Sequence, residues 1–210
     1  MIDVDVLLSW GATYRTLDAG EMIFSEGSQC NFYYQLVSGQ VKWFNINDEG
    51  KEYLQMLIEP GECFGELPLF DGEPYAASAI ATTPAVVLRL HMPTFHQLLQ
   101  EQPAILQRFT TLLAQRVRFK FFLIKEMANN CPENRIAALM KYIRQNKKNI
   151  CCECNQVKLT RQQIADMTGL RVETVIRAMR NMHERKELFI EKGKVYLDDM
   201  TTVIPRRCKE

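Results

Sequence analysis

The C-terminal fold is decided by one stretch of the chain, residues 160–180, which reads Thr160-Arg161-Gln162-Gln163-Ile164-Ala165-Asp166-Met167-Thr168-Gly169-Leu170-Arg171-Val172-Glu173-Thr174-Val175-Ile176-Arg177-Ala178-Met179-Arg180. The pattern predicts two short helices joined by a turn. Thr160 and Gln163 fit a capping box, in which each side chain bonds the backbone N–H of the other residue. Gly169 supplies the backbone freedom that a tight turn needs.

The second of these helices has two unlike faces. Its apolar residues recur at a spacing of three to four and are Val172, Val175, Ile176 and Met179. Its polar residues are Arg171, Glu173, Thr174, Arg177 and Arg180. This layout is typical of a helix-turn-helix whose second helix enters a DNA major groove. An ordinary helical hairpin is the alternative.

The residues that we expect to contact DNA are Thr160, Arg161, Gln162, Arg171, Val172, Glu173, Thr174, Arg177 and Arg180. Glu173 can accept a hydrogen bond from a cytosine amino group, and Arg177 can bridge O6 and N7 of guanine. Val172 can contact a thymine methyl group.

Composition is that of a globular protein of one large or two modest domains. The chain has 210 residues, of which 47% are hydrophobic and 24% charged. No apolar run reaches the roughly 18 residues that cross a membrane, and the N-terminus lacks the basic region of a secretory signal. We therefore expect a cytoplasmic protein without a membrane partner. The seven cysteines are irregularly spaced and do not suggest a disulfide framework.

Charge is distributed unevenly along the chain. The overall net charge of +1 combines −6 over residues 1–130 with +7 over residues 131–210. A basic C-terminal part on an acidic body is typical of a nucleic-acid-binding domain joined to a different domain.

Residues 17–91 show short β-type runs separated by glycines. The runs are Met22-Ile23-Phe24, Phe32–Val37, Gln40–Phe44, Tyr53–Ile58 and Val86–Leu90. Short strands at regular spacing with turn residues between them predict an antiparallel barrel or sandwich. A short helix is expected over Pro93–Gln100.

Pro103 opens a long helical stretch that extends to about Met127. One stripe consists of Leu106, Thr110, Leu113, Val117, Phe121, Ile124 and Ala128. Apolar coverage extends further round the helix through Ile105, Phe109, Leu112, Phe119 and Phe122. A helix with two apolar sides must bury both, which favours one side on its own barrel and the other on a second copy. A single helix buried wholly within one domain is the alternative.

The segment Asn129–Glu133 is expected to break the long helix and begin the next one, because Pro132 fits a first helical turn. A helix with Ile136, Leu139, Met140 and Ile143 on one face should follow. Residues 151–158 are expected to form a loop or short hairpin, and residues 188–197 a strand, a turn and a strand. The predicted organisation is a barrel at 1–102, a dimerisation helix and hinge at 103–130, and a DNA-binding domain at 131–210.

This order of elements resembles the transcription regulators of the cyclic AMP receptor protein and fumarate-nitrate reduction regulator (Crp/Fnr) family. The resemblance rests on four segments: Gly20–Gly27, Val37–Val41, Pro60–Leu67 and Thr160–Arg177. It implies an α+β protein with an N-terminal antiparallel β-barrel of the cyclic-nucleotide-binding, jelly-roll type and a C-terminal winged helix-turn-helix. It further implies a homodimer on palindromic double-stranded DNA, contact with RNA polymerase, and no enzymatic activity.

The resemblance also points to an effector pocket, formed by Gly65, Glu66, Leu67, Tyr75, Ala76 and Lys120. In cyclic-nucleotide binders of this family, an Arg-Ser or Arg-Thr pair holds the cyclic phosphate. Here the matching place reads Pro74-Tyr75-Ala76-Ala77 and offers no such pair. We therefore expect no cyclic AMP dependence, with Glu66 accepting backbone N–H groups in a turn and Lys120 as the one cation within reach.

We expect no cofactor and no metal. Three thiols and a carboxylate in Cys151-Cys152-Glu153-Cys154 could hold a soft metal, but the spacing is not that of a structural zinc site, and incidental thiols are the alternative. Two rival functions stay open beside a ligand-free regulator. One is a regulator gated by an unidentified small ligand, and the other is a protein-interaction scaffold with a degenerate barrel.

Overall fold

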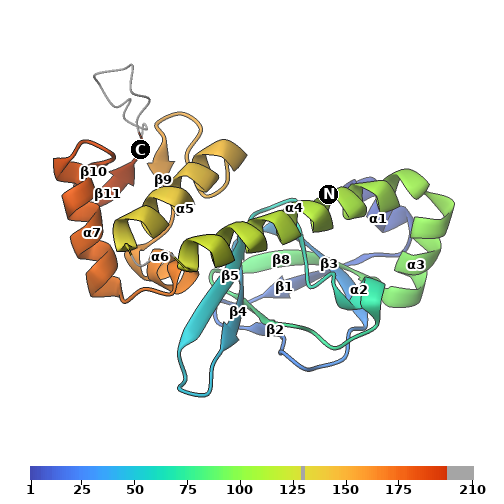
Figure 1. Ribbon diagram of the computed structural model, residues 1–210. Coiled ribbons are helices and arrows are strands. Elements are labelled where there is room, and N and C mark those ends of the chain that lie inside the picture. The colour runs from blue at the N-terminus through green and yellow to red at the C-terminus, as the bar shows by residue number, and fades with distance from the viewer. Residues whose placement is uncertain (129–130, 198–210) are drawn as a thin grey trace. The chain divides into compact units, whose positions relative to one another are not determined.

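The computed structural model describes residues 1–128 and 131–197, and the chain forms two compact units, Met1–Val117 and Arg118–Glu210 (Figure 1). The expected break at Asn129 and Asn130, and residues 198–210 of the expected DNA-binding domain, lie outside the described residues. The three-part division of the chain made from the sequence stays a prediction.

The first unit is built on two four-stranded antiparallel sheets. One has the order β1-β8-β3-β6, with bounds Thr13–Leu17, Ala85–His91, Phe32–Ser38 and Cys63–Phe64. The other has the order β2-β7-β4-β5, with bounds Met22–Phe24, Ser78–Ala81, Val41–Ile46 and Glu52–Ile58. The antiparallel barrel expected from the sequence is confirmed.

The turn between β3 and β4 shows why the sequence places a glycine there. Gly39 has a φ of +85°, and a Cβ atom on it would lie 2.4 Å from the carbonyl oxygen of Pro84. Only glycine combines this left-handed backbone with so close an approach of a neighbouring chain.

Three helices cover the outer face of the first sheet (Figure 1). They are α1 (Val4–Ser9), α3 (Met92–Glu101) and the first part of α4 (Pro103–Met127). The ring of Tyr33 stacks on Phe95 at 4.9 Å between centroids and meets the edge of Phe109 at 6.0 Å. These contacts explain why Ile105 and Phe109 of α4 are buried. The helix predicted over Pro93–Gln100 is confirmed.

The other apolar side of α4 is exposed. Leu106, Val117, Phe121 and Ile124, which we call the exposed stripe, have 42%, 53%, 68% and 64% of their surface accessible. The alternative of a helix buried wholly within one domain is therefore wrong. In the part of the chain that the structure describes, these four side chains stay exposed.

The second unit contains a three-helix bundle and a small sheet. The helices are α5 (Pro132–Asn146), α6 (Arg161–Thr168) and α7 (Val172–Glu184). The sheet has the order β10-β11-β9, with bounds Phe189–Glu191, Lys194–Tyr196 and Gln156–Val157. The expected apolar face of α5 is buried, and the expected strand–turn–strand segment is β10 and β11. This arrangement is a winged helix-turn-helix.

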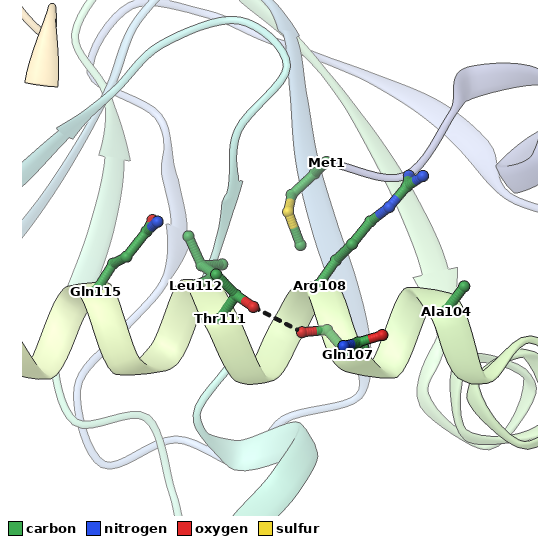
Figure 2. Close-up of a pocket in the computed structure, with 7 residues that line it drawn as sticks. All are labelled: Met1, Ala104, Gln107, Arg108, Thr111, Leu112 and Gln115. Atoms are coloured by element: carbon green, nitrogen blue, oxygen red, sulfur yellow. Dashed lines mark hydrogen bonds between the residues drawn. The ribbon is translucent and has the colours of Figure 1, made fainter.

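Two surface hollows lie within the units. One, of about 440 Å³, runs along the polar side of α4, where Arg108 and Gln115 extend beside the Met1 side chain (Figure 2). Another, of about 330 Å³, lies between α5 and the end of β11 in the second unit. Neither contains a residue that the sequence assigns to DNA or to an effector. In residues 1–128 and 131–197, no helix combines the length and apolar character needed to span a bilayer.

Candidate DNA interface and effector pocket

The helix-turn-helix begins with the capping box expected from the sequence. The Gln163 backbone N–H donates to Thr160 Oγ1 at 3.1 Å, and the Thr160 N–H donates to Gln163 Oε1 at 2.8 Å. Gly169 ends α6 in the left-handed region with a φ of +69°. These features fix the angle at which the chain enters α7.

Helix α7 buries one face against the bundle and exposes the other. Its buried residues are Val175, Ala178, Met179 and Met182. Arg171 precedes the helix without a side-chain cap, as the lack of Ser, Thr, Asp or Asn there indicated. The exposed face includes Glu173, Arg177 and Arg180.

Ile176 does not lie on the buried face, and its assignment to the apolar stripe is wrong. It is 36% exposed. Three residues turn a helix by about 300°, so Ile176 lies beside Glu173, while Val175 and Met179 share the buried side. A large apolar side chain therefore stands among the charged residues of the exposed face.

The predicted DNA contacts are gathered on α6, α7 and the residues just before them. The exposed ones are Thr160, Gln162, Arg171, Glu173, Arg177 and Arg180. The half-buried ones are Arg161, Val172 and Thr174. Gln162 Nε2 donates to Asp166 Oδ1 at 2.8 Å, so this amide is held along α6. Their contacts with bases or phosphates stay predictions.

Arg161 links the first helix of the motif to the wing. Its Nη2 donates to the carbonyl oxygen of Gly193, in the turn between β10 and β11, at 3.4 Å. Burial lowers the pKa of Arg161 from its usual value. Lys192 and Lys194 flank the same turn and are exposed. These two lysines were not among the DNA contacts predicted from the sequence. Their position beside a predicted turn of the wing was the available indication.

In the predicted effector pocket, Glu66 is fully buried and forms an ion pair with Arg116 of α4. Arg116 Nη2 also donates to the Cys63 carbonyl oxygen at 2.7 Å, and its guanidinium carbon lies 5.6 Å from the centroid of the Trp43 ring. The expectation that Glu66 accepts backbone N–H groups in a turn is wrong. Its partner is a cation on a helix 50 residues further along the chain.

Sequence analysis did not select Arg116 and named Lys120 as the one cation within reach. Arg116 lies two turns after buried Phe109, on the same side of α4. The available indication was that Arg116 follows Phe109, a residue of the apolar coverage of the helix, by seven positions. Lys120 belongs to the second unit, and its role in a pocket stays a prediction.

The pKa values of Arg116 and Cys63 are shifted by burial and by the charge of Glu66. Burial acts to lower the pKa of Arg116, but attraction by Glu66 outweighs it and raises the pKa. Burial, followed by repulsion from Glu66, raises the pKa of the Cys63 thiol to about 12. Arg116 therefore stays charged beside a neutral thiol at physiological pH.

Tyr75, which the sequence resemblance places at the position of the phosphate-binding pair, is buried in the first unit. Its ring stacks on Phe24 with centroids 3.8 Å apart, and a Cβ on Gly65 would lie 3.0 Å from it. The Tyr75 N–H donates to the Ser28 carbonyl oxygen at 3.0 Å, and its hydroxyl donates to Cys30 Sγ at 3.1 Å. The neighbouring Ala76 is exposed, as is Leu67 at 36%.

Three buried polar atoms close to the ion pair have no hydrogen-bond partner among the described residues. They are Trp43 Nε1, Arg116 Nε and Glu66 Oε1. Buried polar atoms are normally paired, so this place has unused donors and an unused acceptor.

Cysteine-rich residues 151–154 lie in the turn before β9. The Cys151 N–H donates to the Gln156 carbonyl oxygen at 2.8 Å, and the Asn155 N–H donates to the Cys151 carbonyl oxygen at 3.0 Å. Within residues 1–128 and 131–197, no group of three His, Cys, Asp or Glu side chains is placed to hold a metal ion.

Comparison with known proteins identifies both units. A cyclic nucleotide-binding domain matches residues 14–102, and a Crp-like helix-turn-helix domain matches residues 134–202. The chain is 30% identical over 195 residues to the cAMP-activated global transcriptional regulator CRP of Haemophilus influenzae, covering 90% of this chain and 87% of that protein. The chain belongs to the Crp family. It is a transcription regulator of that family with a helix-turn-helix DNA-binding domain, as the sequence resemblance indicated.

Other Crp-family relatives agree. The cyclic AMP receptor protein of Thermus thermophilus is 28% identical over 92% of this chain and 87% of its own length. The solved structure of FixK2 from Bradyrhizobium japonicum superposes with a TM-score of 0.75 at 20% identity, covering 90% of this chain and 93% of FixK2. The solved structure of the Thermus thermophilus catabolite activator protein superposes with a TM-score of 0.54 at 29% identity. The match covers 93% of this chain and 89% of that protein. These structures share the fold described above.

Proposed function

We propose that this Crp-family regulator acts as a homodimer that binds a palindromic DNA site without cyclic AMP. The observation that carries the proposal is the buried Glu66–Arg116 ion pair, which joins the barrel to α4 through residues of the chain itself. A pocket that depends on a bound anion would leave a cation without a partner until the anion arrives. Here the cation already has one.

The charge at the pocket opposes a cyclic nucleotide. Its phosphate is an anion, and a buried anion needs a charge-assisted partner. Residues 74–77 contribute no cation, and the Tyr75 hydroxyl already donates to Cys30. Redirecting Arg116 to a phosphate would leave Glu66 buried and unpaired, which typically costs several kcal/mol.

Cyclic AMP is therefore expected to produce no saturable heat when titrated into the purified protein at micromolar concentration. Relatives named for cyclic AMP make this the decisive ligand to test. Isothermal titration calorimetry measures it directly. Low-micromolar binding in the wild type that disappears in Arg116→Met would overturn the proposal and identify Arg116 as the phosphate partner.

A regulator gated by a small, uncharged polar ligand is a second candidate. It is favoured by the unpaired buried atoms Trp43 Nε1, Arg116 Nε and Glu66 Oε1, which offer two donors and one acceptor. Thermal-shift screening of polar metabolites tests it. A compound that stabilises the wild type but not Trp43→Phe, which lacks the indole N–H, would identify such a ligand.

The homodimer is supported by the exposed stripe of α4. Four large apolar residues exposed along one side of a 25-residue helix form a surface that monomeric proteins rarely leave to solvent. A helix of this length measures about 37 Å. Pairing it with a second copy provides the seam of a parallel coiled coil.

DNA recognition is assigned to the exposed face of α7. In such a dimer, the two copies of α7 would enter successive major grooves about 34 Å apart. Cations of the second unit, including Lys192 and Lys194 of the wing, would neutralise phosphates and make the affinity depend on salt. Glu173 and Arg177 would contact base edges, and Ile176, being exposed and apolar, would pack on a thymine methyl group beside Val172. Contact of the bound dimer with RNA polymerase is part of the same proposal.

Arg177→Ala should weaken binding to a selected palindrome by about 1–3 kcal/mol and relax the preference for guanine at one position of each half-site. Electrophoretic mobility shifts at fixed salt measure both effects. Arg108→Ala, an equal loss of charge on the exposed polar side of α4, is the matched control.

Equal affinities of wild type and Arg177→Ala for that palindrome would contradict the assignment. In the same assay, probes with deoxyuridine in place of thymine test the contact expected for Ile176. Loss of the methyl group should weaken binding of the wild type at one position and leave Ile176→Ser unaffected there.

A further inference from the structure

Helix α2 (Pro68–Asp71) begins two residues after Glu66, and apolar side chains are exposed at its N-cap and within it. Leu67 is 36% exposed and Phe70 is 38% exposed. Single exposed apolar residues are ordinary on protein surfaces. Leu67 and Phe70 differ from such single residues because they lie next to helix α4.

The segment 66–70 lies alongside α4 and is fastened to it at two levels. The Phe70 ring lies 5.4 Å from the Phe109 ring, between centroids, and Glu66 pairs with Arg116 two turns further along α4. Leu106 and Leu113 each precede one of these α4 residues by three positions. Three positions correspond to a displacement of about 60° round the helix, so Leu113 and the stripe residue Leu106 lie next to the α4 residues that contact the segment 66–70.

Exposed apolar surface therefore continues from α4 onto α2. Leu106 is 42% exposed and Leu113 is half-buried. The bordering α4 residues Leu106, Thr110, Leu113 and Val117 carry no charge, and neither do Leu67 and Phe70. An uncharged surface is complementary to an uncharged partner surface, and a second copy of the same stripe meets this requirement.

We propose that Leu67 and Phe70 of each protomer pack against α4 of the partner, so that α2 belongs to the dimer interface. The inference rests on the proposed homodimer and adds to it a contact outside the helix pair. The partner's helix then covers the segment that holds Glu66. A partner helix that holds this segment in place favours the Glu66–Arg116 pair. Because coupling between two equilibria is reciprocal, the pair then favours the dimer to the same extent.

Leu67→Glu tests the contact, since it places a charge at the interface without disturbing a buried side chain. The matched control is Leu8→Glu on α1, where the leucine is 39% exposed. Sedimentation velocity over a concentration series should show the dimer dissociation constant raised at least tenfold by Leu67→Glu and unchanged by Leu8→Glu. Circular dichroism verifies that both variants are folded.

Hydrogen exchange on the wild type gives an answer that needs no variant. The Phe70 N–H donates to the Leu67 carbonyl oxygen at 2.9 Å, and the Gly72 N–H donates to that of Pro68 at 3.1 Å. Peptides covering these amides should exchange more slowly above the dimer dissociation constant than below it.

The inference is overturned if Leu67→Glu dimerises like Leu8→Glu and α2 exchange is independent of concentration, while glutamates at Leu113 and Val117 still abolish the dimer. In that case the proposed homodimer survives without the α2 contact. A wild type that is monomeric at every concentration overturns both.

Discussion

Arg116→Met is expected to destabilise the first unit by about 3–5 kcal/mol, because it leaves the carboxylate of Glu66 buried without its counter-charge. Glu66 has no accessible surface, so water cannot replace the lost partner. Loss of the bond from Arg116 to the Cys63 carbonyl adds to the effect. A change of this size is a large fraction of the stability of a typical domain.

Urea unfolding followed by tryptophan fluorescence measures this effect selectively. Both tryptophans of the chain, Trp10 and Trp43, lie in the first unit. Arg108→Met removes an exposed arginine from the same helix and should change the stability by less than about 0.5 kcal/mol. The double variant Glu66→Gln with Arg116→Met should recover part of the loss, because no uncompensated charge is then buried.

The pairing would be refuted by an Arg116→Met variant as stable as Arg108→Met. It would equally be refuted by a double variant whose loss is the sum of the two single losses. Additive losses indicate that the two residues do not interact.

Many structural features of the second unit could be predicted from local sequence patterns. The capping box at Thr160, the turn at Gly169 and the strands around residues 189–196 all follow from neighbours within a few positions. Such short-range features are physically visible in a sequence, since the interacting groups are adjacent in the chain. The exposure of Ile176 was not predicted, because an apolar residue at helical spacing is normally buried. Surfaces that bind another molecule are an exception to this tendency.

The effector pocket could not be worked out in the same way. Glu66 and Arg116 are 50 positions apart, and their pairing depends on how α4 packs against the barrel. Motif matching placed Gly65, Glu66 and Tyr75 in one predicted pocket, but it did not identify Arg116, the α4 residue that pairs with Glu66. The lack of an arginine at residues 74–77 was visible in the sequence, whereas the Glu66–Arg116 ion pair was not.

The exposed stripe of α4 illustrates a similar limit. Two-sided apolar coverage indicated that α4 must bury both sides, and the structure shows which side is exposed among the described residues. An exposed apolar surface of this kind is typical of an interaction site. It does not by itself identify the partner, which only a perturbation of the surface can do.

Replacing Leu113 and Val117 by glutamate is expected to convert the proposed homodimer to a monomer. Each protomer would bring two negative charges to a seam that pairs like with like, so that four carboxylates would have to be desolvated close together. Analytical ultracentrifugation should show monomer at micromolar concentration. Glutamates at Gln107 and Thr111, exposed on the polar side of the same helix (Figure 2), are the matched control and should leave the dimer intact.

The same monomer should lose at least about 100-fold in affinity for a palindrome, because the second half-site then no longer benefits from the high effective concentration that a dimer provides. Binding to a single half-site should be nearly unchanged, since the α7 surface is not altered. An intact dimer in Leu113→Glu/Val117→Glu would place the interface elsewhere. A monomer that binds the palindrome as tightly as the wild type would separate DNA recognition from dimerisation and overturn the proposed mode of binding.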